Sequence, residues 1–562
     1  VSARPVICNV RSEHRRFSRH ANLLLVGRDT LHTSFDLREY GPWLAEQRGL
    51  AGPWTPVWAA LQTDIAPALL QQWQSMGMSS SEEITVDPDQ LKLLAYTLIA
   101  SGARGLCFAS HHPVSPHPEI SGRAAALGLL NQDLELIAPW AAAGKIVASV
   151  ATSDPQVHVT VLGLDRSHLV LPIRYVPHSQ FAAGASNTQT ISFVIPGVPD
   201  SSEPFLITSS RLKPLRRKRV AGGMRVTLND FSLTSAIVMT QDPLVIRQLT
   251  RQLAEQRVRR SRFAHDIATH LSTTTESTIL QLAGPGAKAP SVDATLNSAR
   301  STLAQCQQLF QSGDYKASTE YANQAILQLS QVRRATWEQA SGRFRWPVAS
   351  PLLMHFQTLP LHWEMTQRVA MAGEGDNLLA AGDFESLSHM IQNGWQQEIT
   401  SVATVYGDIE LSPQTKKSGN YSLHIRTLTR RPDKEDPLVA IAPVTVRSAA
   451  VTTQPGQLVK IQGWIMVDGE ITRSRDGFVV SDSVGGTGMG LRVSTTDGWQ
   501  PFVLYRTADA SGELRAVFSM TGVGDVFVDD VAVHPIPYSP ANDHTLHQAI
   551  HLRQMLPPPA LR

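Results

Sequence analysis

Polar side chains that could bind or cleave a sugar follow four apolar runs within residues 1–143. Hydrolysis of a glycosidic bond needs two carboxylates, one to protonate the leaving oxygen and one to attack or to activate water. Amide, guanidinium and imidazole groups can bind sugar hydroxyls instead. The candidates at the ends of these runs are Glu13, Arg28, Asp29, Gln62, Asp64 and His111. Gln62, which ends its run, cannot act as a nucleophile, whereas Asp64, two residues further on, has a carboxylate.

The apolar runs predict the elements that would position these side chains. Each run is apolar nearly throughout, as a parallel strand covered on both faces requires. The stretches 35–47 and 89–101 between them have helical spacing, and Asp87-Pro88 is typical of a helix start. We expect an α/β domain whose strands end at one common edge. The predicted strands are Pro5–Val10, Leu23–Gly27, Pro56–Gln62 and Gly105–Ala109.

This region resembles a known barrel family. The segments Gln90–Tyr96 and Gly102–Ser110 are similar to the last helix and strand of β-galactosidase-like glycoside hydrolases, and Asn131–Pro139 looks like their closing helix. The resemblance implies that residues 1–143 are the second half of a TIM barrel, since a complete barrel needs eight strands. In the family the nucleophile ends the seventh strand, which puts Asp64 nearest, and the acid/base ends the fourth. We therefore expect an upstream half of the same polypeptide before Val1.

The remaining chain divides by pattern into further regions. Residues 144–242 alternate in short runs, which predicts an antiparallel β-sandwich. Residues 243–346 predict a helical spacer, 347–376 a linker, and 535–562 a tail. The basic run 211–219 lacks interleaved aromatic residues and is interpreted as a solvated loop.

Residues 377–534 resemble a carbohydrate-binding module with a galactose-binding-like jelly-roll fold. The motifs are Asn377–Glu385, Gly394-Trp395, Ser418–Leu423 and Val526–Val531. The resemblance implies a sugar site in which aromatic rings stack on the sugar and arginines bind its hydroxyls. The aromatic candidates are Tyr406, Trp464, Trp499, Phe502 and Tyr505. We expect the site at Trp499, Tyr505, Arg492 and Arg506.

The same resemblance implies a structural calcium ion. Such modules often bridge the opening acidic residue and the final strand, here Glu385 with Asp529 or Asp530. Carboxylate oxygens are hard ligands that suit Ca²⁺. Plain surface carboxylates, or carboxylates that form hydrogen bonds within the fold, are an equal alternative. No organic cofactor is expected, and the chain has no His-Glu-x-x-His or Cys-x-x-Cys motif for a catalytic metal.

Composition excludes several classes of protein. Lysine and arginine number 50 against 48 aspartates and glutamates, so bulk charge predicts no nucleic-acid partner. No uncharged apolar run reaches the ~18 residues of a membrane span. Three cysteines cannot form a disulfide framework. The chain opens on Val1 without a signal peptide, and we expect it to be part of a longer polypeptide that is extracellular or in the cell envelope, by resemblance.

Two functions remain open. The first is the C-terminal portion of a secreted glycoside-hydrolase-like protein that binds a polysaccharide or glycan, without a complete catalytic pair in this chain. If active, it would be an O-glycosidase whose acid/base lies before Val1. The alternative is a non-catalytic cell-surface or scaffold protein with a degenerate barrel and a spacer jelly roll.

Overall fold

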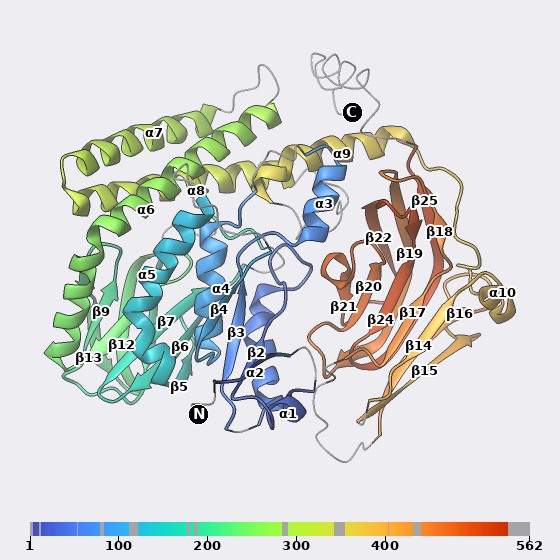
Figure 1. Ribbon diagram of the computed structural model, residues 1–562, viewed down its shortest axis with the longest axis horizontal. Coiled ribbons are helices and arrows are strands. Elements are labelled where there is room, and N and C mark those ends of the chain that lie inside the picture. Colours follow the sequence, from blue (N-terminus) through green and yellow to red (C-terminus); the bar gives the residue numbers. More distant parts are fainter. Residues whose placement is uncertain are drawn as a thin grey trace.

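The computed structural model shows a multidomain α/β chain (Figure 1). It describes residues 4–10, 13–52, 54–78, 84–111, 122–176, 180–184, 189–283, 290–341, 355–402, 404–430, 439 and 441–537. Most of the predicted tail lies outside the described residues. Among those residues, no helix combines the length and the apolar character that crossing a membrane requires.

The N-terminal region contains a parallel sheet of four strands in chain order. All three neighbouring pairs are parallel, so the four predicted strands are confirmed. The sheet does not close into a barrel, because within the described residues β1 pairs only with β2 and β4 only with β3. The strands are β1 (Ile7–Asn9), β2 (Leu23–Val26), β3 (Val57–Gln62) and β4 (Leu106–Ala109).

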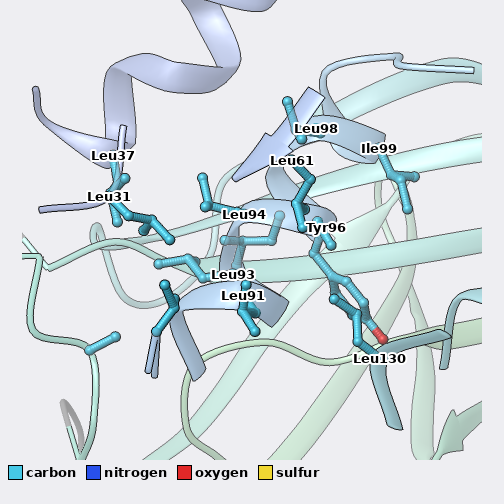
Figure 2. Close-up of a cluster of buried hydrophobic side chains, with 14 of the residues drawn as sticks. Leu31, Leu37, Leu61, Leu91, Leu93, Leu94, Tyr96, Leu98, Ile99 and Leu130 are labelled. Atoms are coloured by element: carbon cyan, nitrogen blue, oxygen red, sulfur yellow. The ribbon is translucent and has the colours of Figure 1, made fainter. Parts of the chain in front are cut away.

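The main helices of this region cover one face of the sheet. Asp87 caps the helix α4 by accepting the amide of Asp89 at 3.0 Å, as the sequence predicts. Leu61 of β3 packs among Leu94, Leu98 and other apolar side chains of α4 (Figure 2). The helices are α1 (His14–Phe17), α2 (Tyr40–Leu50), α3 (Pro67–Ser75), α4 (Pro88–Ala100) and α5 (Gly122–Ala143).

The opposite face of the sheet is open. Leu24 and Ala59, which point toward the helices, are fully buried. Ile7 and Trp58, which point the other way, are 53% and 36% exposed. Parallel sheets are ordinarily covered on both faces, whereas the described residues cover this sheet mainly on one face.

A β-sandwich follows the α/β region, with a six-stranded and a three-stranded sheet. One interpretation from the sequence is wrong: the basic run 211–219 is not a loop but contributes to β10 and β11. The side chains of β11 are mostly exposed, so a charged edge strand produces the same polar pattern as a loop. The strands are β5 (Lys145–Val150), β6 (Val157–Leu164), β7 (Ser167–Arg174), β8 (Gln189–Ile195), β9 (Glu203–Ile207), β10 (Leu212–Pro214), β11 (Arg216–Val220), β12 (Gly223–Phe231) and β13 (Ile237–Thr240).

Long helices form the next region and continue into the predicted linker. Figure 1 shows α9 running from the helical region to the jelly roll, so the described part of this connection, residues 355–376, is largely helical. The helices are α6 (Pro243–Ala283), α7 (Pro290–Gln311), α8 (Tyr315–Ser341), η3 (Phe356–Thr358) and α9 (Leu359–Ala372).

The C-terminal region is a jelly-roll sandwich of two five-stranded sheets. Phe478, Phe502 and Phe518 pack between the sheets and are nearly inaccessible to solvent. One sheet has the order β14 (Gln396–Ile399), β17 (Val444–Arg447), β24 (Ala516–Met520), β20 (Phe478–Asp482), β21 (Leu491–Val493). The other has the order β15 (Val405–Ser412), β16 (Ser422–Thr429), β25 (Val523–Pro535), β19 (Leu458–Thr472), β22 (Gln500–Thr507).

Candidate functional site

Gln62, at the end of β3, holds the backbone that follows β2. Its Oε1 accepts the amides of Thr30 and Leu31 at 2.9 and 2.8 Å, and its Nε2 donates to the carbonyl of Asp64 at 2.9 Å. The side chain is 3% exposed. Its hydrogen bonds are therefore used to join two neighbouring strand ends, rather than being offered to a sugar.

Asp64 lies in a buried polar cluster at the ends of β3 and β4. Its Oδ2 accepts the amide of His111 at 2.8 Å and the hydroxyl of Ser110 at 3.3 Å, and lies 3.7 Å from the guanidinium of Arg123. Arg123 also donates to Ser110 and to Thr63. This carboxylate is fixed by a cation and by backbone, an arrangement that holds the end of β4 in place.

Of the other residues predicted at this edge, Glu13 and Arg28 make side-chain contacts elsewhere rather than with the carboxylate of Asp64. Glu13 pairs with Arg16 of α1 at 3.0 Å, and Asp29 is exposed. Arg28 turns toward the jelly roll, where it meets Asp476. The imidazole of His111 is exposed, and only its backbone amide bonds Asp64.

A buried pair of histidines close to this edge was missed from the sequence. The rings of His32 and His355 lie 5.2 Å apart with their planes at 66°, and Trp73 lies beside them. Burial lowers the pKa of His32 to about 4, so this ring is neutral at pH 7. No spacing rule could have joined two histidines so far apart in the chain.

Of the four residues predicted for the sugar site in the jelly roll, Tyr505 and Arg506 are buried and Arg492 is partly buried. Tyr505 is 4% exposed and packs with Met365 of α9, and burial raises its pKa to about 12. Arg492 bonds Asp476 at 2.7 Å and also Ser34 of the α/β region. Arg506 is fully buried against Asp482 at 2.6 Å.

The prediction of a sugar site at Tyr505, Arg492 and Arg506 is therefore wrong. These residues lie on or beside the edge strands β21 and β22, and both edges face the α/β region. The alternating pattern of a strand predicts which side chains point away from the core of the sandwich. It does not show whether another region of the chain packs over them. Gly485 confirms the tight packing, because a Cβ there would lie 2.6 Å from Nε of Arg506. Trp499, just before β22, is partly exposed.

The outer face of the sheet β15–β16–β25–β19 carries a different group of functional side chains. Cross-strand pairing places Glu410, His424, Phe527 and Met466 in one row. A second row contains Asp408, Arg426 and Asp525. In a strand, alternate residues share a face, and the intervening residues here, among them Ile425, enter the core. We call this surface the outer sheet face.

Hydrogen bonds tie the two rows together. His424 lies between two carboxylates, with Nδ1 3.0 Å from Glu410 and Nε2 2.8 Å from Asp525. Its ring stacks on Phe527 with centroids 4.3 Å apart. Arg426 donates to Asp408 at 2.6 Å, which raises the pKa of the arginine. Buried imidazole and phenyl rings thus support a surface of partly exposed carboxylates.

Aromatic side chains border the outer sheet face. Trp464 of β19 is partly exposed, and the ammonium of Lys417 lies 3.9 Å from the centre of its ring. Tyr406 of β15 is 42% exposed and lies on the same side of its strand as Asp408. Phe502, in contrast, is a core residue. Of the five aromatic candidates, Tyr406 and Trp464 belong to this face.

The three residues predicted to bind calcium all accept hydrogen bonds from one loop, residues 417–421. Glu385 accepts the amides of Asn420 and Tyr421 at 2.7 and 3.1 Å, and these bonds, rather than burial, lower its pKa. Asp529 accepts the amides of Lys417 and Ser418, and Asp530 accepts the hydroxyl of Ser418. The three carboxylates that the resemblance implied therefore bind the same loop.

As they stand, these carboxylates are directed at N–H and O–H donors rather than arranged as a set of metal ligands. Across the described ranges, no group of three or more His, Cys, Asp or Glu is placed to hold a metal ion. The donor set therefore fits a loop anchor better than a calcium ion. Calcium binding at Glu385, Asp529 and Asp530 stays a prediction.

Comparison with known proteins gives structural likeness only. No family model matches the chain, and no curated protein matches it. The enzymatically active domain of tailspike protein 4 from bacteriophage CBA120 is similar over 28% of this chain at 15% identity with a TM-score of 0.19, and this chain spans 21% of that one. The CBM22-1 xylan-binding domain of Xyn10C from Paenibacillus barcinonensis is similar over 30% of this chain and 99% of its own, at 15% identity and a TM-score of 0.20.

The α-fucosidase of Thermotoga maritima is similar over 38% of this chain and 42% of its own, at 11% identity and a TM-score of 0.23. The solved structures that resemble the chain thus include carbohydrate-binding modules and glycoside hydrolases. From its own geometry, the C-terminal region is a jelly-roll sandwich with a charged outer sheet face bordered by aromatic residues.

Proposed function

We propose that this chain binds a polysaccharide or glycan on the outer sheet face of its jelly roll. The observation that carries the proposal is the group of Glu410, Asp525 and Asp408, whose side chains are 55%, 32% and 46% exposed. These carboxylates are held in place by His424 and Arg426 and point out of a rigid sheet. Fixed polar groups on a sheet bind with a lower ordering cost than groups on a mobile loop.

The chemistry of the outer sheet face suits sugar hydroxyls. Carboxylates accept two or more hydrogen bonds each, and charge-assisted bonds are the stronger ones. Tyr406 and Trp464 supply apolar ring surface beside these acceptors. A sugar offers both O–H donors and an apolar C–H face, so it would engage both kinds of side chain.

We propose further that the N-terminal region is half of a glycosidase-like barrel whose inner face is covered by the upstream half. The one-sided helices and the exposure of Ile7 and Trp58 support this partner. Asp64 is already paired with Arg123, so hydrolysis would need an acid/base from that other half. A protein of this kind would work outside the cell or in the cell envelope.

A glycan array tests the binding proposal directly. The full chain should bind one class of neutral glycan, and Glu410→Gln should weaken that binding about tenfold or more while leaving the melting temperature within about a degree or two. Asp497→Asn, at an exposed position of the same jelly roll, is the matched control. No binding to any glycan would contradict the proposal and favour the alternative, a scaffold protein whose jelly roll is a spacer.

A further inference from the structure

A second candidate binding site lies far along the chain from the jelly roll. It is a cavity of about 650 Å³ between the helices α4, α5, α6 and α8 and the turn that joins β9 to β10. Figure 1 shows α4, α5 and α6 in the half of the molecule that contains the sandwich, apart from the jelly roll. The residues that line the cavity all fall between positions 92 and 323. Ligand sites commonly measure about 300–1,000 Å³ and lie between domains.

The wall of the cavity contains a buried arginine that the described residues satisfy only in part. Arg260 is 2% exposed; its Nη2 donates to Asp133 at 2.5 Å and its Nε to the carbonyl of Ser209 at 2.9 Å. Its Nη1 has no hydrogen-bond partner among the residues that the structure describes. An unsatisfied buried charged donor is destabilising unless something binds it.

Lys92 lies on the other side of the same carboxylate. Its Nζ is 2.9 Å from Oδ2 of Asp133, and 37% of its side chain is exposed. Burial alone would raise the pKa of Asp133, but Lys92 and Arg260 lower it, so this carboxylate is ionised. A single carboxylate, that of Asp133, pairs with both Lys92 and Arg260, so this part of the cavity wall has a net positive charge.

The rim does not cancel this charge. Arg211 and Lys213 add two cations, while Asp230 and Glu320 add two carboxylates. Glu320 is itself engaged, since it accepts the hydroxyl of Ser210 at 3.0 Å. The charged side chains that line the cavity therefore have a net charge of +1. A bound monoanion would neutralise that charge and could accept from Arg260 and Lys92.

The rest of the lining is rich in groups that bind hydroxyls. These are Thr208, Ser209, Ser210, Thr234, Ser235 and Asn323. We propose that this cavity binds an acidic saccharide, whose carboxylate meets Arg260 and Lys92 and whose hydroxyls meet the serine, threonine and asparagine side chains. The inference is independent of glycan binding by the jelly roll, because no residue is shared between the two sites.

Isothermal titration of the full chain with D-glucuronate, D-glucose and inorganic phosphate tests the proposal. Glucuronate should bind more tightly than glucose, by about tenfold or more, because its carboxylate adds a charge-assisted hydrogen bond that glucose cannot form. Lys92→Met, which removes the ammonium but keeps the apolar stem, should weaken glucuronate binding about tenfold. Lys218→Met makes the same change at an exposed position of β11 outside the cavity and should have no effect.

Three results would overturn the proposal. They are equal affinity for glucose and glucuronate, phosphate binding as tightly as glucuronate, and unchanged glucuronate binding in Lys92→Met. If Lys92→Met does not fold, Lys213→Met at the exposed rim replaces it. This variant should bind glucuronate about fivefold more weakly, and unchanged binding would overturn the proposal. Glu410→Gln should leave glucuronate binding here intact, which separates failure of this proposal from failure of the jelly-roll proposal.

Discussion

Arg28 and Asp476 are 448 positions apart in the chain, yet they form a two-pronged ion pair with N–O distances of 2.7 and 3.1 Å. Arg492 joins the same carboxylate from the jelly roll at 2.7 Å. The guanidinium of Arg28 also lies 4.0 Å from the centre of the Phe35 ring. A sequence-predicted sugar-binding arginine is thus a structural link between the end of β2 and the jelly roll.

Asp476→Asn should loosen this junction. The substitution leaves two partly buried arginines without their carboxylate, and removing one partner of a buried ion pair costs about 3–5 kcal/mol when solvent is excluded. Asp476 retains some exposure, so we expect about 2 kcal/mol and a lower melting temperature by calorimetry. Asp497→Asn, at an exposed position, should not change the melt. Identical melts for both variants would contradict the junction's role.

Acid should destabilise the chain in two separate pH windows. Burial lowers the pKa of His32 and of His362 to about 4, so the unfolded chain takes up these protons first and stability falls as pH drops from about 6.5 to 4. Burial would raise the pKa of Asp476, but Arg28 and Arg492 lower it to about 2, so its contribution is lost between about pH 4 and 2.

Urea unfolding at several pH values separates the two windows. His32→Asn should reduce the loss of unfolding free energy between pH 6.5 and 4 by roughly 3 kcal/mol or less, because it removes one of the two titrating imidazoles. Asparagine is chosen because it tolerates the left-handed backbone at this position, where φ is 57°. Asp476→Asn should flatten only the lower window. Unfolding that is independent of pH between 6.5 and 4 would contradict the burial of the histidines.

The open face of the four-stranded sheet should contribute little to the stability of this chain. Ile7→Ala removes a side chain that is 53% exposed, and we expect less than about 1 kcal/mol. Leu24→Ala, the matched change on the covered face of the sheet, should cost about 2–5 kcal/mol. Equal losses in chemical denaturation would show that the inner face is covered within this chain.

The calcium prediction is tested by melting the full chain with CaCl₂ and with a chelator. A calcium ion bound only to the folded state would stabilise it by about 2.7 kcal/mol at a hundredfold excess over Kd. Glu385→Ala should remove the difference between the two melts. Equal melts of the parent chain would leave the loop 417–421 anchored by hydrogen bonds alone.

The elements of this chain were easier to predict from the sequence than its sites. The strands of the parallel sheet and the cap at Asp87 are set by local apolar runs and local hydrogen bonds, which neighbouring residues reveal. The outer sheet face depends on pairing: His424 meets Glu410 across 14 positions and Asp525 across 101. Arg492 and Tyr505 had the right residue types for a sugar site, but the packing of another region over their strands could not be deduced from one sequence.

The most direct test of the account compares the affinity of the full chain and three variants for the best glycan from the array. Glu410→Gln and Trp464→Ala, both on the outer sheet face, should each weaken binding about tenfold or more. Trp499→Ala, just before β22 and not in either of the two rows that define that face, should leave the affinity unchanged. A loss of affinity confined to Trp499→Ala would contradict the account and return the sugar site to the position that the sequence first suggested.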